Sequence, residues 1–120
     1  MSIFSDWEFA KPHIEAALAY SKGTHTIDDV AIMVGAGMLS LVVGRGCAML
    51  TEVQNYPRIR VLNVFAAGGD LAGLLELENG LLNLAKEKGC QRVTETGRKG
   101  WLRTLPGAKE LGTALYRDVS

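Results

Sequence analysis

Apolar residues recur at helical spacing near the start of the chain. Between Pro12 and Ser21 they fall on one face of a helix, and Trp7 and Ala10 extend the same face upstream. Because proline lacks an amide hydrogen, Pro12 is expected near the first turn of this helix. Gly23 should then stop it.

A second helix is predicted directly afterwards, from Ile27 to about Gly35. Thr26 and Asp29 precede and open this segment at the spacing of a capping box. In such a box the hydroxyl accepts a hydrogen bond from a backbone amide of the first turn, while the carboxylate reaches back to the cap residue. The sequence therefore predicts where this helix begins.

Two short apolar runs follow and predict a β-hairpin. They cover Met38–Val43 and Cys47–Val53, and Gly44 and Gly46 lie between them, where a tight turn needs positive φ angles. A third run, Arg58–Ala66, carries apolar residues on both faces. That pattern is typical of a central strand.

The clearest helical stripe lies between Asp70 and Gly89. Leucines recur there after a glycine turn at residues 66–70, Asp70 is a suitable N-cap, and Gly89 is a suitable stop. Cys90–Thr96 is predicted to be a strand. Because a helix connects it to the previous strand, the two strands are expected to be parallel.

The last part of the chain is predicted to add a short helical turn and a final strand. Trp101 is expected in the core because Leu102 and Leu105 share its helical face, and Pro106 and Gly107 break this turn. Residues 111–119 alternate in the manner of a strand. The whole order predicts an α+β (α/β) domain with a mixed central sheet and helices on both faces.

Composition narrows the class of protein. The 120 residues suit one domain over 1–120, and 48% hydrophobic with 22% charged residues indicates a folded chain. Thirteen basic and thirteen acidic residues balance, so no overall field attracts nucleic acid or anionic membranes. The longest apolar run, around 31–43, is too short to cross a bilayer, and no signal-peptide pattern opens the chain. We expect a soluble, cytoplasmic or virion-associated protein that does not bind membranes, and any contact with nucleic acid would have to be local.

Few residues suggest metal or hydrolytic chemistry. Cys47 and Cys90 lie outside any metal-ligand spacing, so both are expected to be free thiols packed as small apolar side chains. His13 and His25 have no acidic or cysteine partner at ligand spacing and are expected to be surface or capping residues. The sequence contains no nucleophile elbow, Walker loop or metal-binding helix, and we therefore expect no bound metal.

The order of the predicted elements resembles that of the GCN5-related N-acetyltransferase (GNAT) superfamily over nearly the whole chain. The most diagnostic stretch is Arg58–Trp101, in which a central strand leads into a glycine turn, an amphipathic helix and a parallel strand. Residues 89–93 (Gly-Cys-Gln-Arg-Val) and 97–101 (Gly-Arg-Lys-Gly-Trp) are similar to a small subset that phages often encode.

This resemblance implies an acetyl-CoA-dependent N-acyltransferase that acts on an amine. In the family, amides of the glycine turn bind the pyrophosphate, and an amide near the end of the central strand polarises the thioester carbonyl. The cofactor-binding positions would be Val64, Phe65, Ala66, Ala67, Gly68, Gly69 and Leu71. Glu52 is the candidate base because its strand borders the acceptor side, Glu95 is a second candidate base, and Tyr116 is the candidate acid.

The sequence also departs from the family pattern. No basic or amide residue precedes the glycine turn at the usual place, Asp70 puts a carboxylate where phosphates approach, and residues 99–105 lack the family's asparagine and tyrosine. The alternative is a non-catalytic structural or interaction protein, such as a phage virion or host-interaction component, in which acetyl-CoA binding is lost.

Two surface features bear on partners. Ile3, Phe4 and Trp7 are apolar enough to dock on other protein subunits, and the alternative is that they pack within the same chain. A basic group surrounds Trp101 and suits either a phosphate, such as the cofactor's 3'-phosphate, or nucleic acid, unless it is simply a solvated face. Its members are Arg92, Arg98, Lys99 and Arg103.

Overall fold

The computed structural model describes residues 3–19, 23–95, 109, 111 and 117–119. These residues form three helices and one four-stranded mixed sheet, an α+β fold. In chain order the elements are α1 (Ile3–Leu18), α2 (Ile27–Gly35), β1 (Ser40–Gly44), β2 (Cys47–Asn55), β3 (Arg60–Gly69), α3 (Leu71–Glu87) and β4 (Arg92–Glu95). The strands lie side by side in sequence order, and only β3 and β4 are parallel. The predicted fold class and the predicted parallel pair are confirmed.

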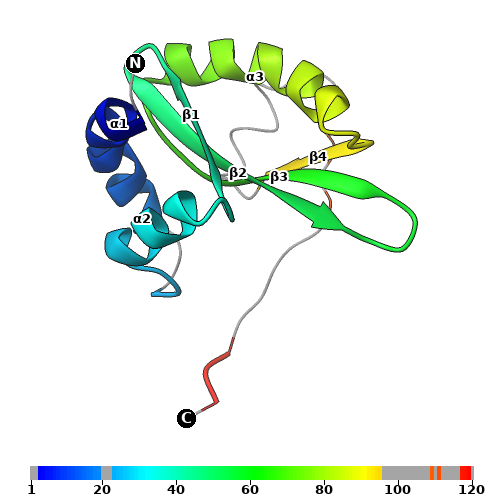
Figure 1. Cartoon of the computed structure of the whole chain (residues 1–120), viewed down its shortest axis with the longest axis horizontal. Coiled ribbons are helices and arrows are strands. Elements are labelled where there is room, and N and C mark those ends of the chain that lie inside the picture. Colours follow the sequence, from blue (N-terminus) through cyan, green and yellow to red (C-terminus); the bar gives the residue numbers. More distant parts are fainter. Residues whose placement is uncertain (1–2, 20–22, 96–108, 110, 112–116, 120) are drawn as a thin grey trace.

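The helices cover both faces of the sheet (Figure 1). Helices α1 and α2 lie on one face and enclose a buried cluster of Ala10, Ile14, Val30, Leu39, Ala48 and Leu50. Helix α3 lies on the other face and encloses Cys47, Met49, Leu62, Val64, Leu74, Leu81, Ala85 and Cys90. The alternation of side chains along β2 sends neighbouring residues to opposite clusters, which explains why its first half is buried on both sides.

The start of the first helix was predicted wrongly. Helix α1 begins at Ile3, and Pro12 lies in its interior instead of its first turn. Pro12 is exposed, so water can solvate the Glu8 carbonyl that loses its amide partner. Trp7 is half-buried and packs onto the cluster under α1 and α2. Of the two alternatives for Trp7, the structure has packing within the same chain.

The second helix agrees with the prediction at both ends. Helix α2 covers Ile27–Gly35, and Thr26 and Asp29 make both hydrogen bonds of the capping box. Hydrogen bonds from the backbone and side chain of Thr26 lower the pKa of Asp29, because they stabilise its ionised form. The hairpin is also present: β1 begins at Ser40 instead of Met38, and β2 begins at Cys47 as predicted but continues to Asn55.

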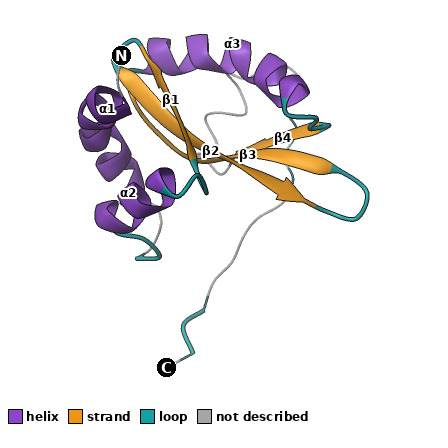
Figure 2. Cartoon of the chain, in the orientation of Figure 1, coloured by secondary structure: helices purple, strands orange, loops and turns teal. Residues whose placement is uncertain are grey.

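The central strand is longer than predicted. The glycine doublet was assigned to a turn, but Gly68 pairs with Ala48 and Gly69 pairs with Cys47, so both belong to the end of β3. The register between the two strands shifts by one residue at a bulge between Leu50 and Thr51, where Phe65 of β3 has no partner on β2. Figure 2 shows the tip of the β2–β3 hairpin, with its loop, projecting beyond the helices.

Some predicted features lie outside the described residues. They are the helical turn at Trp101, most of the final strand, the acid candidate Tyr116, and three members of the basic group, Arg98, Lys99 and Arg103. Among helices of the described segments, none is long and apolar enough to span a membrane.

Candidate functional site

The glycine turn at the end of β3 is packed by main-chain atoms of this chain. A Cβ at Gly68 would collide with the carbonyl oxygen of His13 on α1. At Gly69, which has a φ of 115°, a Cβ would collide with the carbonyl oxygen of Gly46 in the β1–β2 turn. Of these two glycines only Gly69 has a positive φ, but close packing requires both of them to be glycine.

Asp70 closes the same turn from the helix side. It is the N-cap of α3, and its Oδ2 accepts a 3.0 Å hydrogen bond from the amide of Gly73. The Asp70 amide in turn donates to the carbonyl of Gly46, at 2.9 Å. A carboxylate of this chain therefore already accepts the hydrogen bond of one of the amides that a phosphate would need as donors.

The edge of β3 beyond β4 holds the other predicted cofactor positions. The last pair between the two strands is Val64 with Glu95, and no described strand pairs with β3 on this side from Phe65 to Gly69. Val64 is buried under α3, whereas Phe65 is half-buried on the other face. Its ring meets that of His25 edge-on, 4.8 Å between centroids. His25, expected at the surface or in a cap, is thus half-buried against an aromatic ring.

Glu52 lies in a row of polar side chains that crosses three strands. Its Oε1 accepts hydrogen bonds from Nδ2 of Asn63 and Nε2 of Gln54, each at 3.0 Å. Asn63 Oδ1 accepts from the hydroxyl of Thr94 on β4, at 2.8 Å, and Tyr56 extends the row by donating to Gln54 Oε1. Glu52, Asn63 and Thr94 are register partners, so they share the face of the sheet that α1 and α2 cover farther along.

Glu95 lies on the opposite face from Glu52 and is paired with a second acid. Its register partner Val64 belongs to the cluster under α3, and its own carboxyl meets Glu78 on that helix. Burial first, and then the hydrogen bond and charge of Glu78, raise the pKa of Glu95 to about 9. Oε1 of each acid is buried with no hydrogen-bond partner among the described residues.

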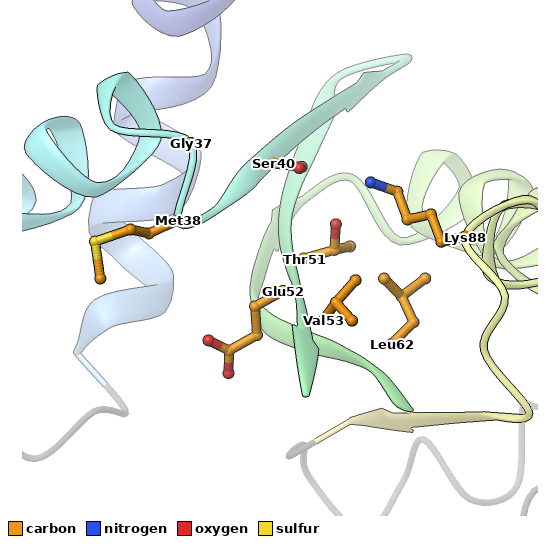
Figure 3. A pocket seen from close by; sticks show the side chains of 8 residues that line it. All are labelled: Gly37, Met38, Ser40, Thr51, Glu52, Val53, Leu62 and Lys88. Carbon is orange, nitrogen blue, oxygen red and sulfur yellow. The ribbon is translucent and has the colours of Figure 1, made fainter. Parts of the chain in front are cut away.

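A pocket of about 200 Å³ opens at the other end of the sheet from the glycine turn. It lies between the start of β1, the middle of β2 and the C-terminal end of α3. Its lining includes Ser40, Thr51, Val53, Leu62 and Lys88. Figure 3 shows the hydroxyls of Ser40 and Thr51 and the ammonium of Lys88 turned toward one another, whereas the carboxylate of Glu52, also at the rim, points away.

The structure does not gather the predicted residues into one place. Glu52 stands beside Asn63, five residues before Gly68 along β3, which is about 16 Å of strand. Glu95 lies on the opposite face of the sheet, under α3, and Tyr116 is outside the described residues. Sequence reasoning missed Asn63, Thr94, Glu78 and the pocket residues, because only the register between distant strands and helices brings them together.

The described segments contain no candidate metal site. No group of three or more His, Cys, Asp or Glu side chains there is arranged to hold a metal ion. Both cysteines are buried free thiols. Burial, followed by the nearby carboxylates of Asp70 and Glu76, raises the pKa of Cys47.

Comparison with known proteins gives a similar fold and no family. No protein-family model matches the sequence, and no curated protein matches it. Among solved structures, the chain is similar to the protein TTHA1254 from Thermus thermophilus, both as wild type (TM-score 0.64) and as a point mutant (TM-score 0.65). Each match has 12% sequence identity and covers 97% of this chain and 92% of the other. At that identity the likeness concerns the fold alone.

Proposed function

We propose that this chain is a non-catalytic, GNAT-like protein that binds acetyl-CoA weakly or not at all and works through contacts with other proteins. The observation that carries the proposal is that the glycine turn is already filled by contacts within this chain. Main-chain carbonyls of α1 and of the β1–β2 turn pack directly against its glycines, and the carboxylate of Asp70 accepts the hydrogen bond of the Gly73 amide. A turn used in this way serves packing rather than the binding of a pyrophosphate.

Charge works in the same direction. A bound pyrophosphate would approach the carboxylate of Asp70, and no basic residue stands just before the turn to offset it. A like charge screened by solvent costs about 1 kcal/mol, or about a fivefold loss of affinity. Displacing Asp70 from the Gly73 amide would add the loss of an existing cap, typically about 1 kcal/mol.

Exposed apolar side chains support a role in protein contacts. Ile32 on α2 is 71% exposed and Met38, just after that helix, is 61% exposed. Phe9 on α1 is 44% exposed. Phenylalanine and methionine are enriched at protein interfaces relative to the rest of the protein surface. We therefore include other protein subunits, in a virion or a host cell, among the proposed partners.

Titration calorimetry with acetyl-CoA tests the proposal. The wild-type chain should give no binding in the low-micromolar range, and mixtures with acetyl-CoA and simple amines should release no CoA thiol. Asp70→Asn, which keeps a cap of similar shape but removes the charge, serves as the matched variant. Low-micromolar binding by the wild-type chain, with turnover on amines, would discard the proposal.

An acetyl-CoA-dependent N-acyltransferase is the second candidate, and the polar row at Glu52 favours it. A base held by Asn63 and Gln54 about 16 Å along β3 from the turn suits a cofactor whose long pantetheine arm separates pyrophosphate from thioester. The edge of β3 from Phe65 to Gly69, which no described strand pairs with on the β4 side, would supply the amide donor. Turnover that Glu52→Gln suppresses, with acetyl-CoA affinity unchanged, would establish this candidate.

A further inference from the structure

The pocket between β1, β2 and the end of α3 contains a buried hydroxyl without a partner. Thr51 is 1% exposed, and its Oγ1 makes no hydrogen bond with any described residue. A hydroxyl removed from water in this way costs free energy unless something else bonds to it. Thr51 lines the pocket, and its hydroxyl is directed toward Ser40 and Lys88 (Figure 3). A ligand in the pocket would supply the missing partner.

The groups around Thr51 favour an anion. Ser40 is its register partner on β1 and presents a second hydroxyl from the neighbouring strand. Lys88, the C-cap of α3, is half-buried and directs its ammonium to the same point. The one carboxylate at the rim, Glu52, points away and is held by Asn63 and Gln54 on the other face. Two hydroxyl donors and one cation therefore converge, and the carboxylate of Glu52, the one acid among the residues that line the pocket, is turned away from them.

The end of α3 does not cancel this positive charge. Carbonyls at a helix C-terminus carry partial negative charge when they are unpaired. Here the carbonyls of Leu84, Ala85 and Lys86 accept hydrogen bonds from amides just after the helix, those of Lys88, Cys90 and Gly89 respectively. The helix end is closed by its own chain, so the Lys88 ammonium remains the dominant charge facing the pocket.

We propose that this pocket binds a small oxyanion, a phosphate or a carboxylate, through Ser40, Thr51 and Lys88. A volume of about 200 Å³ accommodates such an anion with one or more waters. Hydroxyls and an ammonium donate to anionic oxygens in charge-assisted hydrogen bonds. The pocket lies at the Ser40 end of β1, whereas the glycine turn lies at its Gly44 end. The proposal is thus independent of whether the glycine turn binds acetyl-CoA.

The test measures binding of inorganic phosphate and of acetate to the full chain at constant ionic strength, by calorimetry and by thermal shift. Lys88→Met and Thr51→Val are the site variants, and Lys86→Met is the control because Lys86 is an exposed lysine of the same helix turn that does not line the pocket. We expect wild-type binding of at least one anion at millimolar or lower concentration. Each site variant should weaken it about tenfold, the loss of a hydrogen bond to a charged group, and the control should not.

The two anions distinguish the two kinds of ligand. Binding of phosphate alone would identify a phosphate site, and binding of acetate alone would identify a carboxylate site. Failure of both anions to bind at millimolar concentration would overturn the proposal, and so would an equal loss with Lys86→Met. Because Lys88 is partly exposed, Lys88→Met keeps the test decisive even if Thr51→Val were to fold poorly.

Discussion

The main-chain carbonyl of His13 on α1 lies against Gly68 on β3 so closely that no Cβ fits between them. This contact sets how near α1 approaches the sheet and therefore how the cluster beneath it is closed. On the same strand end, Gly69 meets the β1–β2 turn in the same manner. The glycines that resemble a cofactor-binding turn thus determine the distance between layers of this fold.

Gly68→Ala is expected to lower the free energy of unfolding by about 2 to 3 kcal/mol, because the new methyl must push α1 away from β3. Gly80→Ala is the matched control, since nothing lies within 4 Å of its added Cβ and the residue sits inside α3. That change should stabilise the chain by up to about 1 kcal/mol through helix propensity. Urea denaturation of both variants measures the difference. Equal stability of Gly68→Ala and the wild type would contradict this account of the turn.

Features set by neighbouring residues could be predicted from the sequence. The capping box needs only Thr26 and Asp29, and both of its hydrogen bonds are present. Asp70 likewise caps the N-terminus of α3. Gly89, which has a φ of 73°, directly follows Lys88, the C-cap of the same helix. The parallel pairing of β3 and β4 followed from the helix between them. In each case the physical cause lies within a few residues or in a rule of chain connection.

Features set by distant contacts could not be predicted in this way. Pro12 argued for a helix start, but the packing of Trp7 and Ala10 beneath α1 outweighs the one hydrogen bond that proline removes. The pairing of Glu78 with Glu95 depends on where α3 crosses β4. Thr51 gave no chemical signal in sequence, since only its register with Ser40 and its burial distinguish it from other strand threonines.

Stability should fall as the pH rises, because of the pair formed by Glu78 and Glu95. The pKa of Glu95 is raised from 4.5 to about 9, so the folded chain holds a proton that the unfolded chain releases. This contribution is complete below pH 4.5 and is lost progressively as the pH rises through about 9. Glu95→Gln, which resembles the protonated acid, should flatten the slope and stabilise the chain at pH 8 by about 1 to 2 kcal/mol.

Denaturation midpoints of the wild type and Glu95→Gln across this pH range provide the measurement. Glu87→Gln is a suitable control because Glu87 is an exposed residue of α3, the helix that carries Glu78. This variant should leave the slope of stability against pH unchanged. Stability that is flat with pH in the wild type would show that the two carboxyls do not share a proton in solution.

The thiol of Cys47 should resist alkylation in the folded chain. It is fully buried and lies against the positions of Gly44 and Gly73, and burial with the nearby acids Asp70 and Glu76 raises its pKa. Thiolates react and thiols do not, so both access and ionisation oppose the reaction. In a Cys90→Ser background, labelling by iodoacetamide at pH 8 should be negligible until denaturant is added. Rapid labelling of the native chain would mean that the β1–β2 turn opens readily from α3.

The hydrogen bonds among Glu52, Asn63 and Thr94 should act as a coupled unit. Asn63 is the link, because it donates to Glu52 and accepts from Thr94. Asn63→Leu leaves both neighbours without this partner and should cost about 2 kcal/mol, whereas Thr94→Val removes one neutral hydrogen bond and should cost about 1 kcal/mol. Gln54→Leu takes away only the other donor to Glu52 and serves as the comparison.

A double-mutant cycle with Glu52→Gln and Asn63→Leu measures the coupling directly. Glu52→Gln removes the charge of the acceptor and Asn63→Leu removes the donor, so either change ends the charge-assisted bond, and the second change should cost less than it does alone, with an interaction energy of about 1 kcal/mol. The cycle is informative because the two residues are register partners and no other described side chain bridges them. Strictly additive free energies would mean that water competes successfully for Glu52, and that the row across β2, β3 and β4 does not hold this carboxylate in place.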